Sequence, residues 1–252
     1  MKGLAGKSII VTGGGSGIGA AVALYLAEEG AKVTVGDVNQ QGGETTVQSI
    51  EAAGGTAQFI ATDVSQEEDV KALVAAAVKA FGKLDGACNA AGVSQRGKAM
   101  HEITIEEWDR CHGINLRGMF LCNKYEVLSL LESGGGAIVN IASTVSVVAV
   151  QNGAEYCASK SGVMGLVRGA ALDYATKGIR VNAVLPGGTL TPMLTSATEQ
   201  DPGLRKALED VHPMRRFGAP SEIAGAVLWL LSDDASFVTG SSIAVDGGQL
   251  AI

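Results

Sequence analysis

Short runs of apolar and β-branched residues alternate with longer stretches of helical periodicity along the whole chain of 252 residues. The first pair is a strand-like run at 8–11 and a helical stretch from Ile18 to Glu29, which Gly30 ends. Strands that alternate with helices in this way form parallel β-α-β units, and helices cover both faces of the resulting sheet. The pattern predicts a single-domain α/β protein with a Rossmann-like, doubly wound fold and a central parallel sheet of about seven strands.

The rest of the chain continues this alternation. The segment at 65–81 is expected to be a helix capped by Ser65, because Glu68 stands three residues later in the capping-box position. The stretch at 105–131 predicts one long helix or two joined ones. Further strands are predicted at 32–35, 57–61, 84–88, 137–141, 180–185 and 242–245, and further helices at 41–53, 155–176 and 221–231.

The segment at 187–220 breaks the alternation. It is long, and it contains four of the five prolines: Pro192, Pro202, Pro213 and Pro220. A segment of this kind in a compact domain is typically a lid or a binding loop. We therefore expect one domain over residues 1–252, with a substrate lid at about 187–220.

Charge and apolar runs argue against several classes of protein. The formal charge of -7 argues against a nucleic-acid-binding surface. No apolar run approaches the ~20 residues that span a bilayer, and the amino terminus lacks the apolar region of a signal peptide. We expect a cytoplasmic protein with no membrane or nucleic-acid partner and no metal site. Its cysteines have no metal-ligand spacing and are expected to be reduced: Cys88, Cys111, Cys122 and Cys157.

A glycine-rich turn at 12–19 follows the first predicted strand and opens the first helix. Glycine lets the backbone approach a phosphate closely, and the amino terminus of the helix supplies free N–H groups for a dinucleotide pyrophosphate. Two spacings fit, Gly15-x-Gly17-x-x-Ala20 and Gly13-x-x-x-Gly17-x-Gly19. The alternative is a tight turn with no ligand.

Asp37 ends the second predicted strand, about twenty residues after the turn. A carboxylate at this point accepts hydrogen bonds from the adenosine ribose and repels a 2′-phosphate, so we predict NAD rather than NADP. Asp37 could instead be a solvated loop residue. Asp63, after the third strand, is expected either to cap a helix or to hold the adenine edge.

Tyr156 and Lys160 stand four positions apart and share one face of a predicted helix. The ordinary pKa of tyrosine is ~10, and a neighbouring lysine cation favours the phenolate. Such a tyrosine can take a proton from an alcohol as a hydride leaves the carbon, or return it in the reverse direction. The pair alone is a weak signal, because most such pairs are surface helix faces.

Further motifs strengthen this interpretation, and together they resemble the short-chain dehydrogenase/reductase family over nearly the whole chain. The resemblance rests on the glycine-rich turn and on motifs that follow in family order: Asp63-Val64, Asn89-Ala90-Ala91-Gly92, Asn115, Ser143, Tyr156-Cys157-Ala158-Ser159-Lys160, Pro186-Gly187 and Asp246-Gly247-Gly248.

The resemblance implies roles for four residues. Tyr156 would be the general acid/base, and Lys160 would lower its pKa and bind the nicotinamide ribose. Ser143 would hydrogen-bond the substrate oxygen. Asn115 would hold a water that links Lys160 to solvent. Ser143 could instead only end a strand, and Asn115 could be a packing residue in mid-helix.

The residues expected to bind the cofactor lie in the glycine-rich turn and at the ends of the strands. Thr189 is less certain among them, since the family often has a branched aliphatic residue at its position. The full set is Gly13, Ser16, Gly17, Ile18, Gly19, Asp37, Asp63, Val64, Asn89, Ala90, Gly92, Tyr156, Lys160, Pro186, Gly187, Thr189 and Thr191.

The predicted substrate pocket is mostly apolar, so we expect a small hydrophobic secondary alcohol or its ketone. The chain resembles bacterial family members that act on alicyclic alcohols and diols, or on terpenols. Ordinary core and lid packing is the alternative reading of the same residues. The expected lining is Ser143, Val145, Val150, Met193, Leu194 and Met214.

Other functions stay open. Arg96 and Gln95 could favour a hydroxy acid or a 3-oxoacyl thioester, and His212 in the predicted lid could contact substrate. A non-catalytic NAD-binding regulator would keep the fold but would typically lose the tyrosine or the lysine. The resemblance also implies a homotetramer or homodimer, for which the apolar residues around Met164, Leu166 and Val167 are the only sequence hint.

Overall fold

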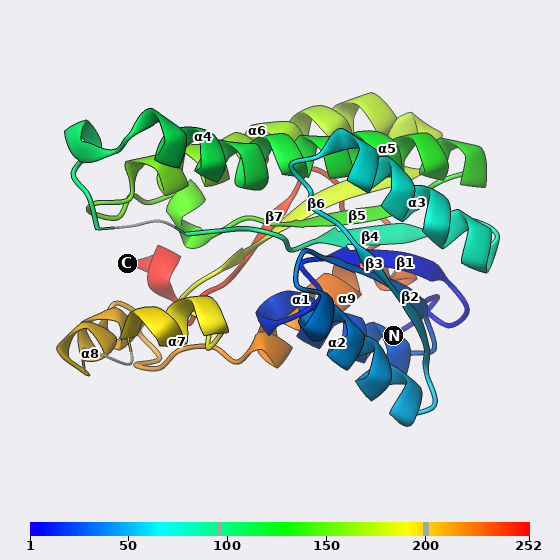
Figure 1. Ribbon diagram of the computed structural model, residues 1–252, viewed down its shortest axis with the longest axis horizontal. Coiled ribbons are helices and arrows are strands. Elements are labelled where there is room, and N and C mark those ends of the chain that lie inside the picture. The colour runs from blue at the N-terminus through cyan, green and yellow to red at the C-terminus, as the bar shows by residue number, and fades with distance from the viewer. Residues whose placement is uncertain (95–96, 199–201) are drawn as a thin grey trace.

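Seven parallel strands form one sheet in the order β3-β2-β1-β4-β5-β6-β7. The structure is a computed structural model that describes residues 1–94, 97–198 and 202–252 (Figure 1). The parallel sheet and its strand order confirm the predicted doubly wound α/β fold. The strands are β1 (Ser8–Thr12), β2 (Lys32–Asp37), β3 (Thr56–Ala61), β4 (Gly86–Asn89), β5 (Gly136–Ile141), β6 (Ile179–Pro186) and β7 (Ser242–Val245).

Helices cover both faces of the sheet (Figure 1). One layer holds α1 (Gly17–Glu28), α2 (Gln40–Ala52) and α9 (Pro220–Leu231), and the other holds α3 (Glu67–Phe81), α5 (Met119–Ser133) and α6 (Ala154–Tyr174). Within the described residues, none of these helices is long and apolar enough to cross a membrane.

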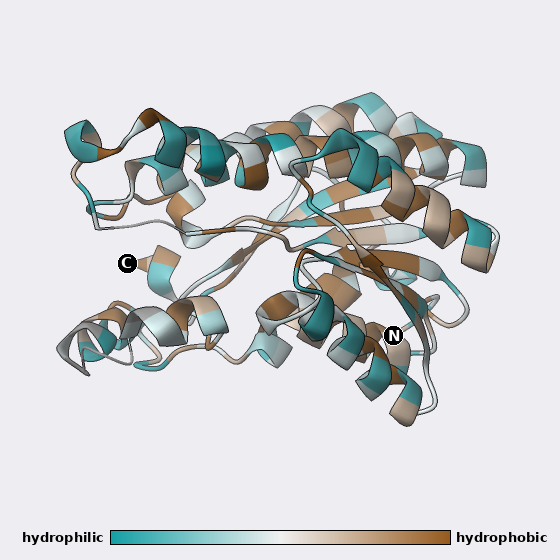
Figure 2. Ribbon diagram, in the orientation of Figure 1, coloured by the Kyte–Doolittle hydropathy of each residue, from teal (hydrophilic) through white to brown (hydrophobic). Residues whose placement is uncertain are grey.

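The two layers enclose two apolar clusters, one on each side of the sheet. Val11, Val35 and Val139 face the cluster under α1 and α9, and Ile10, Ile138 and Val181 face the cluster under α5 and α6. Strands that are buried on both faces are apolar at nearly every position, as is typical of a parallel sheet. Figure 2 shows the apolar strands between helices whose outer faces are hydrophilic.

The strand order reverses between β1 and β4, and ligands of doubly wound sheets bind at such a reversal. The carboxyl ends of these two strands are paired at Thr12 and Asn89, and the chain leaves β1 toward α1 but leaves β4 toward the opposite layer, so the segments that follow them diverge. The glycine-rich turn after β1 and the Ala90–Gly92 segment after β4 therefore lie at the carboxyl-terminal ends of the central strands, where the site is expected.

Two local predictions need correction or refinement. Ser65 does not cap α3: the helix begins at Glu67, and the Ser65 hydroxyl donates to Asp63 Oδ1 at 2.7 Å. The stretch at 105–131 is two helices, α4 (Ile105–His112) and α5, joined by a π-helical turn at Gly113–Gly118. The segment at 187–220 contains two short helices of its own, α7 (Pro192–Thr198) and α8 (Pro202–Asp210).

Candidate active site

The glycine-rich turn packs directly on the backbone after β4. A Cβ at Gly13 would lie 2.6 Å from the amide nitrogen of Ala91, and a Cβ at Gly19 would lie 2.1 Å from the carbonyl oxygen of Gly13. Gly13 and Gly17 also have φ values of 66° and 53°, a region that favours glycine. These constraints require glycine at all three positions of the Gly13-x-x-x-Gly17-x-Gly19 spacing.

The amino terminus of α1 opens toward this turn. Its N-cap residue Ser16 makes no side-chain capping bond within the described structure, and the first turn of the helix has no acidic residue there. The uncapped N–H groups and the positive end of the helix dipole suit a bound phosphate. The turn, called the cradle below, thus combines close backbone packing with a free helix amino terminus, the two features that a pyrophosphate site requires.

The Asp37 carboxylate is fixed beside the cradle. Asp37 Oδ2 accepts a hydrogen bond from the Gly15 amide at 2.8 Å, and Oδ1 accepts one from the Asn39 amide at 2.8 Å. The side chain is held by the loop and is not a freely solvated residue. Asp63, the other predicted carboxylate, accepts from the amide of Ser65 at 2.9 Å and so stabilises the turn before α3.

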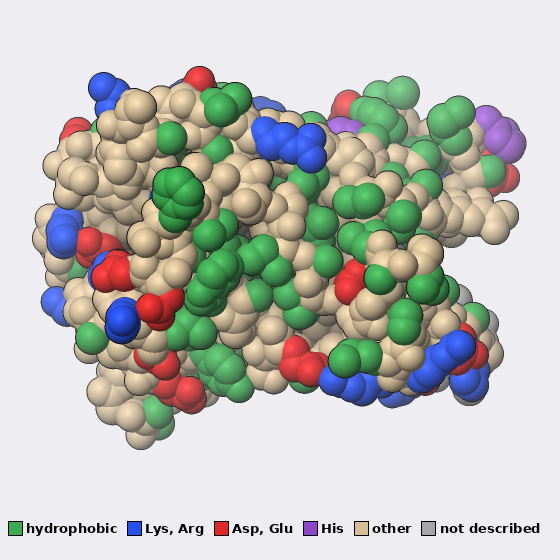
Figure 3. Space-filling view, turned by 180° about the vertical axis from the view of Figure 1, so that it is seen from behind, with side chains coloured by type: hydrophobic (Ala, Val, Ile, Leu, Met, Phe, Trp, Pro, Cys, Tyr) green, Lys and Arg blue, Asp and Glu red, His purple; other side chains and the backbone are tan. Residues whose placement is uncertain are grey.

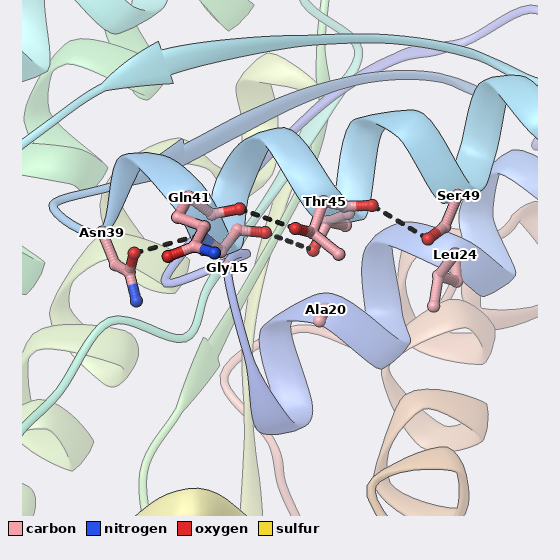
Figure 4. Close-up of a pocket in the computed structure, with 9 residues that line it drawn as sticks. Gly15, Ala20, Leu24, Asn39, Gln41, Thr45 and Ser49 are labelled. Carbon is pink, nitrogen blue, oxygen red and sulfur yellow. Dashed lines mark hydrogen bonds between the residues drawn. The ribbon is translucent and has the colours of Figure 1, made fainter.

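A groove of about 450 Å³ runs between α1 and α2 next to Gly15 (Figure 4). The hydroxyls of Thr45 and Ser49 each donate to a carbonyl oxygen one turn earlier at 2.8 Å, so they offer only acceptor capacity to the groove. The lining has no lysine or arginine, and it consists of Gly15, Ala20, Leu24, Asn39, Gln41, Gly42, Thr45, Thr46 and Ser49. This groove adjoins the Asp37 side of the cradle and contains none of the predicted catalytic residues.

Lys160 is buried on α6 with its ammonium group against the end of β5. Its Nζ donates to the carbonyl oxygen of Ile141 at 2.8 Å and lies 5.9 Å from the ring centroid of Tyr156. Burial lowers the pKa of Lys160 from 10.5 to about 8. The cation is thus held in a dry position beside the half-buried phenol of Tyr156.

Ser143 follows β5 two residues after Ile141. Its Oγ accepts a hydrogen bond from the Val145 amide at 3.3 Å and so begins the short 3-10 turn at Thr144–Ser146. The hydroxyl of Ser146 in turn donates to the carbonyl oxygen of Lys160 at 2.9 Å. This bond ties the 3-10 turn that follows Ser143 to α6, the helix that carries Tyr156 and Lys160.

Asn115 lies fully buried in the π-helical turn between α4 and α5. Its Oδ1 accepts from the Val93 amide at 2.8 Å, and its Nδ2 donates to the Val93 carbonyl oxygen at 2.9 Å and lies 3.2 Å from Ser159 Oγ. A π-helical turn is rare and is often found at functional sites. Here it aims the amide at the loop after β4, so Asn115 is not a simple packing residue.

Gly92 connects these parts of the site. A Cβ at Gly92 would lie 3.3 Å from Asn115 Oδ1 and 3.5 Å from Lys160 Nζ. Asn115 and Lys160 therefore both approach the same point on the loop after β4. Ser159 adds a second link, between Asn115 and α6. Its hydroxyl accepts from the Asn115 amide and donates to the Tyr156 carbonyl oxygen at 2.9 Å.

Asn89 belongs to a buried polar network under the site. Its Nδ2 donates to Glu126 Oε2 at 2.8 Å and to Asn140 Oδ1 at 3.1 Å, and Asn123 also donates to Asn140 Oδ1 at 2.8 Å. Burial raises the pKa of Glu126 from 4.5 to about 7. The Asn89 side chain thus joins β4 to β5 and α5, and its backbone is the part that reaches the edge of the sheet.

The turn after β6 closes the other side of the site. Thr191 is next to the cradle, since a Cβ at Gly17 would lie 3.0 Å from Thr191 Cγ2. Thr189 is buried, and its hydroxyl donates to the Gly187 carbonyl oxygen at 3.0 Å. The structure therefore brings the Pro186–Thr191 stretch together with the glycine-rich turn, as the sequence predicts.

The predicted pocket residues differ in exposure. Val145 is buried, Val150 and Leu194 are half-buried, and Met193 and Met214 are 45% and 65% exposed. Seen from behind, the surface is hollowed between the end that carries α4 and the end that carries α7 and α8, with hydrophobic side chains on both sides (Figure 3). Hydrophobic side chains thus border an open hollow at this end of the molecule.

Sequence reasoning missed the partners of several residues. Ser159 and Cys111 contact the Asn115 amide, and Glu126 is the acceptor for Asn89, but these partners lie far apart in the chain and share no motif. Both ring nitrogens of His212 bond to backbone groups, so neither is left to hydrogen-bond a substrate while these bonds are made. Gln95 and Arg96 lie outside the described residues.

Comparison with known proteins gives consistent relatives. A family model described as Enoyl-(Acyl carrier protein) reductase matches residues 13–249. The chain is 51% identical over 253 residues to a 2,5-dichloro-2,5-cyclohexadiene-1,4-diol dehydrogenase of Sphingobium indicum, with 100% of each chain covered. It is 44% identical to a cyclohexanol dehydrogenase of Acinetobacter sp., with 96% of this chain and 94% of that protein covered. The crystal structure of a levodione reductase superposes with a TM-score of 0.93 at 40% identity and 98% coverage of both chains.

Proposed function

The chain belongs to the short-chain dehydrogenase/reductase family, and from this premise we propose an NAD-dependent enzyme that interconverts a hydrophobic, alicyclic secondary alcohol or diol and its ketone. Membership makes the protein an oxidoreductase that uses a nicotinamide cofactor. The observation that carries the proposal is the buried position of Lys160 beside Tyr156, at the loop after β4 on which the glycine-rich turn also packs.

The residues of the cradle fit a dinucleotide. The space left by Gly13 and Gly19 admits backbone but no side chain, and the uncapped start of α1 would hold the pyrophosphate. When bound in its oxidised form, the nicotinamide accepts a hydride from the alcohol carbon. Pro186, Thr189 and Thr191 would hold the nicotinamide end.

Tyr156 would carry the proton in this reaction. In the oxidation direction its phenolate takes the hydroxyl proton of the substrate while the carbon loses its hydride, and in the reduction direction the phenol returns the proton. Lys160 favours the phenolate by its charge. The bond from Lys160 to the Ile141 carbonyl oxygen keeps the ammonium in place through both directions.

Ser143 and Asn115 would act by position. Ser143 Oγ accepts a hydrogen bond from the Val145 amide of the 3-10 turn, and its hydroxyl proton remains to be donated to the substrate oxygen, where charge develops. Asn115 fixes the loop after β4 through both its amide groups. A water between Asn115 and Lys160 would supply the route by which the proton reaches solvent.

The preference for NAD follows from charge beside Gly15. Asp37 is held at this point by two backbone amides, and a 2′-phosphate would meet its carboxylate. The adjoining groove offers acceptor oxygens and no cation among its lining residues. Both features support NAD, and neither supplies a partner for the additional phosphate of NADP.

The substrate class is inferred from the apolar lid and from the relatives. Met193 and Met214 are exposed apolar side chains of the 187–220 segment and Leu194 is half-buried there, and the similar proteins include two dehydrogenases named for six-membered carbocyclic substrates. An acyl-carrier substrate is less well supported, because the net charge of -7 gives no basic docking surface. We propose that the stretch at about 187–220, with α7 and α8, acts as the lid of a single domain over 1–252.

We also propose a homotetramer or homodimer in the cytoplasm. Met164 and Val167, the residues that suggested an interface from sequence, are buried in the subunit's own core. The exposed large apolar side chains on the two long helices α5 and α6 are Phe120, Leu128, Leu131 and Leu172. The free cysteines, three of them buried, fit a reducing compartment.

A substrate panel tests the proposed function. Cyclohexanol, a cyclic cis-diol, a linear secondary alcohol and a 3-hydroxyacyl thioester are each offered with NAD and NADP, and reduced cofactor is followed by its absorbance. We expect the highest kcat/KM with a cyclic alcohol and NAD. Turnover of the thioester alone, or of NADP alone, would contradict the proposal.

A further inference from the structure

We infer that His212 is a positioning residue that, as a neutral ring, ties the end of α8 to the Gly187–Thr189 turn. His212 stands two residues after α8 and is 3% exposed. Its Nε2 accepts a hydrogen bond from the Gly188 amide at 2.9 Å, and its Nδ1 lies 2.9 Å from the Leu208 carbonyl oxygen. One imidazole therefore joins two segments that are about twenty residues apart in the sequence.

The two bonds fix which nitrogen carries the proton. A backbone amide can only donate, so Nε2 must be an acceptor, and a carbonyl oxygen can only accept, so Nδ1 must carry the proton. This neutral tautomer satisfies both groups. A proton on Nε2 would face the Gly188 N–H and remove the bond.

The shape of the turn is matched to the ring. A Cβ at Gly187 would lie 2.8 Å from His212 Nε2, and a Cβ at Gly188 would lie 2.8 Å from Phe217 and 3.0 Å from His212 Cε1. The Phe217 ring stands edge-on to the imidazole, with centroids 6.2 Å apart. The two glycines are thus required by the imidazole and the phenyl ring that pack on them.

Backbone bonds hold the same turn from its other sides. Gly187 donates to the Val245 carbonyl oxygen at 3.1 Å, and Gly218 donates to the Gly188 carbonyl oxygen at 2.9 Å. The Gly188 amide has His212 as its acceptor, and this hydrogen bond is partly buried. Loss of the ring removes the protein acceptor of that N–H, which is costly for a donor partly screened from water, so the turn should open or shift.

The functional consequence rests on the proposed function. The turn continues into Thr191, which contacts Gly17 of the cradle, and α8 belongs to the proposed lid. A fixed turn would present Pro186 and Thr189 to the nicotinamide in one arrangement. His212 would therefore act on the cofactor through the turn and would not touch it.

Amide exchange tests the tie without any cofactor. Peptides that cover Gly188 are followed by hydrogen–deuterium exchange in the parent and in His212→Leu and His212→Gln. Glutamine can place its carboxamide oxygen near the position of Nε2, whereas leucine has no acceptor. We expect exchange at Gly188 at least about tenfold faster in His212→Leu and near the parent rate in His212→Gln.

A matched control is available in α4. His112 Nδ1 also lies near a carbonyl oxygen one turn earlier, that of Trp108 at 3.1 Å, so His112→Leu removes a similar local contact far from the turn. It should leave exchange at Gly188 unchanged. If His212→Leu does not fold, His212→Asn replaces it, because asparagine keeps a polar group but is too short to reach Gly188.

Cofactor binding tests the consequence. Fluorescence titration should give an NADH Kd about tenfold higher in His212→Leu, the equivalent of one lost hydrogen bond, with recovery in His212→Gln. The KM for NAD should rise more than kcat falls. Unchanged exchange at Gly188 would overturn the tie, and faster exchange with an unchanged Kd would overturn the positioning role. If the parent binds neither NADH nor NADPH, the proposed function fails, and the exchange result still decides the tie.

Discussion

Replacing Lys160 with methionine should stabilise the protein at neutral pH while removing its activity. The Lys160 ammonium is buried, and burial lowers its pKa from 10.5 to about 8. The unfolded chain keeps the ordinary pKa, so below pH 8 the folded state carries the full cost of the buried charge. At about 1.4 kcal/mol per pKa unit, the pKa difference between the two states corresponds to about 3 kcal/mol.

The hydrogen bond from Lys160 to the Ile141 carbonyl oxygen offsets part of this cost. A net value of about 1 kcal/mol for that bond leaves methionine about 2 kcal/mol more stable at pH 7. Between pH 8 and pH 10.5 the folded state binds fewer protons than the unfolded state, so the parent's free energy of unfolding rises with pH. The advantage of methionine should therefore approach zero near pH 9.5.

Thermal unfolding without cofactor, at one protein concentration and at pH 7 and 9.5, measures both effects. We expect a Tm about 5 °C higher for Lys160→Met at pH 7. Lys206→Met is the matched control, since that side chain is 70% exposed and should change stability by less than about 0.5 kcal/mol. A Lys160→Met protein that is less stable than the parent at pH 7, or equally favoured at both pH values, would refute the reasoning.

Three further predictions concern the neighbouring residues. Burial raises the pKa of Glu126 from 4.5 to about 7, so the parent's free energy of unfolding should fall as pH rises through that window. Glu126→Gln should be about 3 kcal/mol more stable than the parent at pH 8, with no advantage at pH 4.5, as followed by urea unfolding. Gly19→Ala should lower the free energy of unfolding by more than about 2 kcal/mol and abolish NADH binding, because its Cβ would meet the Gly13 carbonyl oxygen. The control is Gly225→Ala, which has open space around it and should raise the free energy of unfolding by about 0.5–1 kcal/mol. Asp37→Ser should reduce the kcat/KM preference for NAD over NADP at least about tenfold, and an unchanged ratio would show that the carboxylate does not select the cofactor.

The fold could be predicted because its signals are local and repeated. Each strand is an apolar run such as that of β1, and each helix has its own periodicity, so element order and the parallel sheet follow from short windows of sequence. The position of the glycine-rich turn after β1 then places the cradle at the edge of the sheet. The prediction that Ser65 caps a helix was wrong because its hydroxyl donates to Asp63 Oδ1 instead. The capping pattern in the sequence does not distinguish these two arrangements.

The interior of the site was less predictable because its contacts join distant segments. The amide of Asn115 meets Val93 and Ser159 only after the π-helical turn has changed the phase of the helix. His212 has two backbone partners that no spacing rule connects. The sequence motif identified Lys160 but could not predict the lowered pKa of its ammonium group. That shift comes from burial, to which the loop after β4 near Lys160 Nζ contributes.

The central claim is that the Tyr156 phenol moves the substrate proton, and Tyr156→Phe tests it most directly. Phenylalanine keeps the ring beside Lys160 and removes only the hydroxyl. We predict that kcat for a cyclic secondary alcohol falls by about 10²–10⁴-fold, that the NADH Kd stays within about threefold, and that Tyr174→Phe at the far end of α6 behaves as the parent. Turnover by Tyr156→Phe within tenfold of the parent would contradict the account.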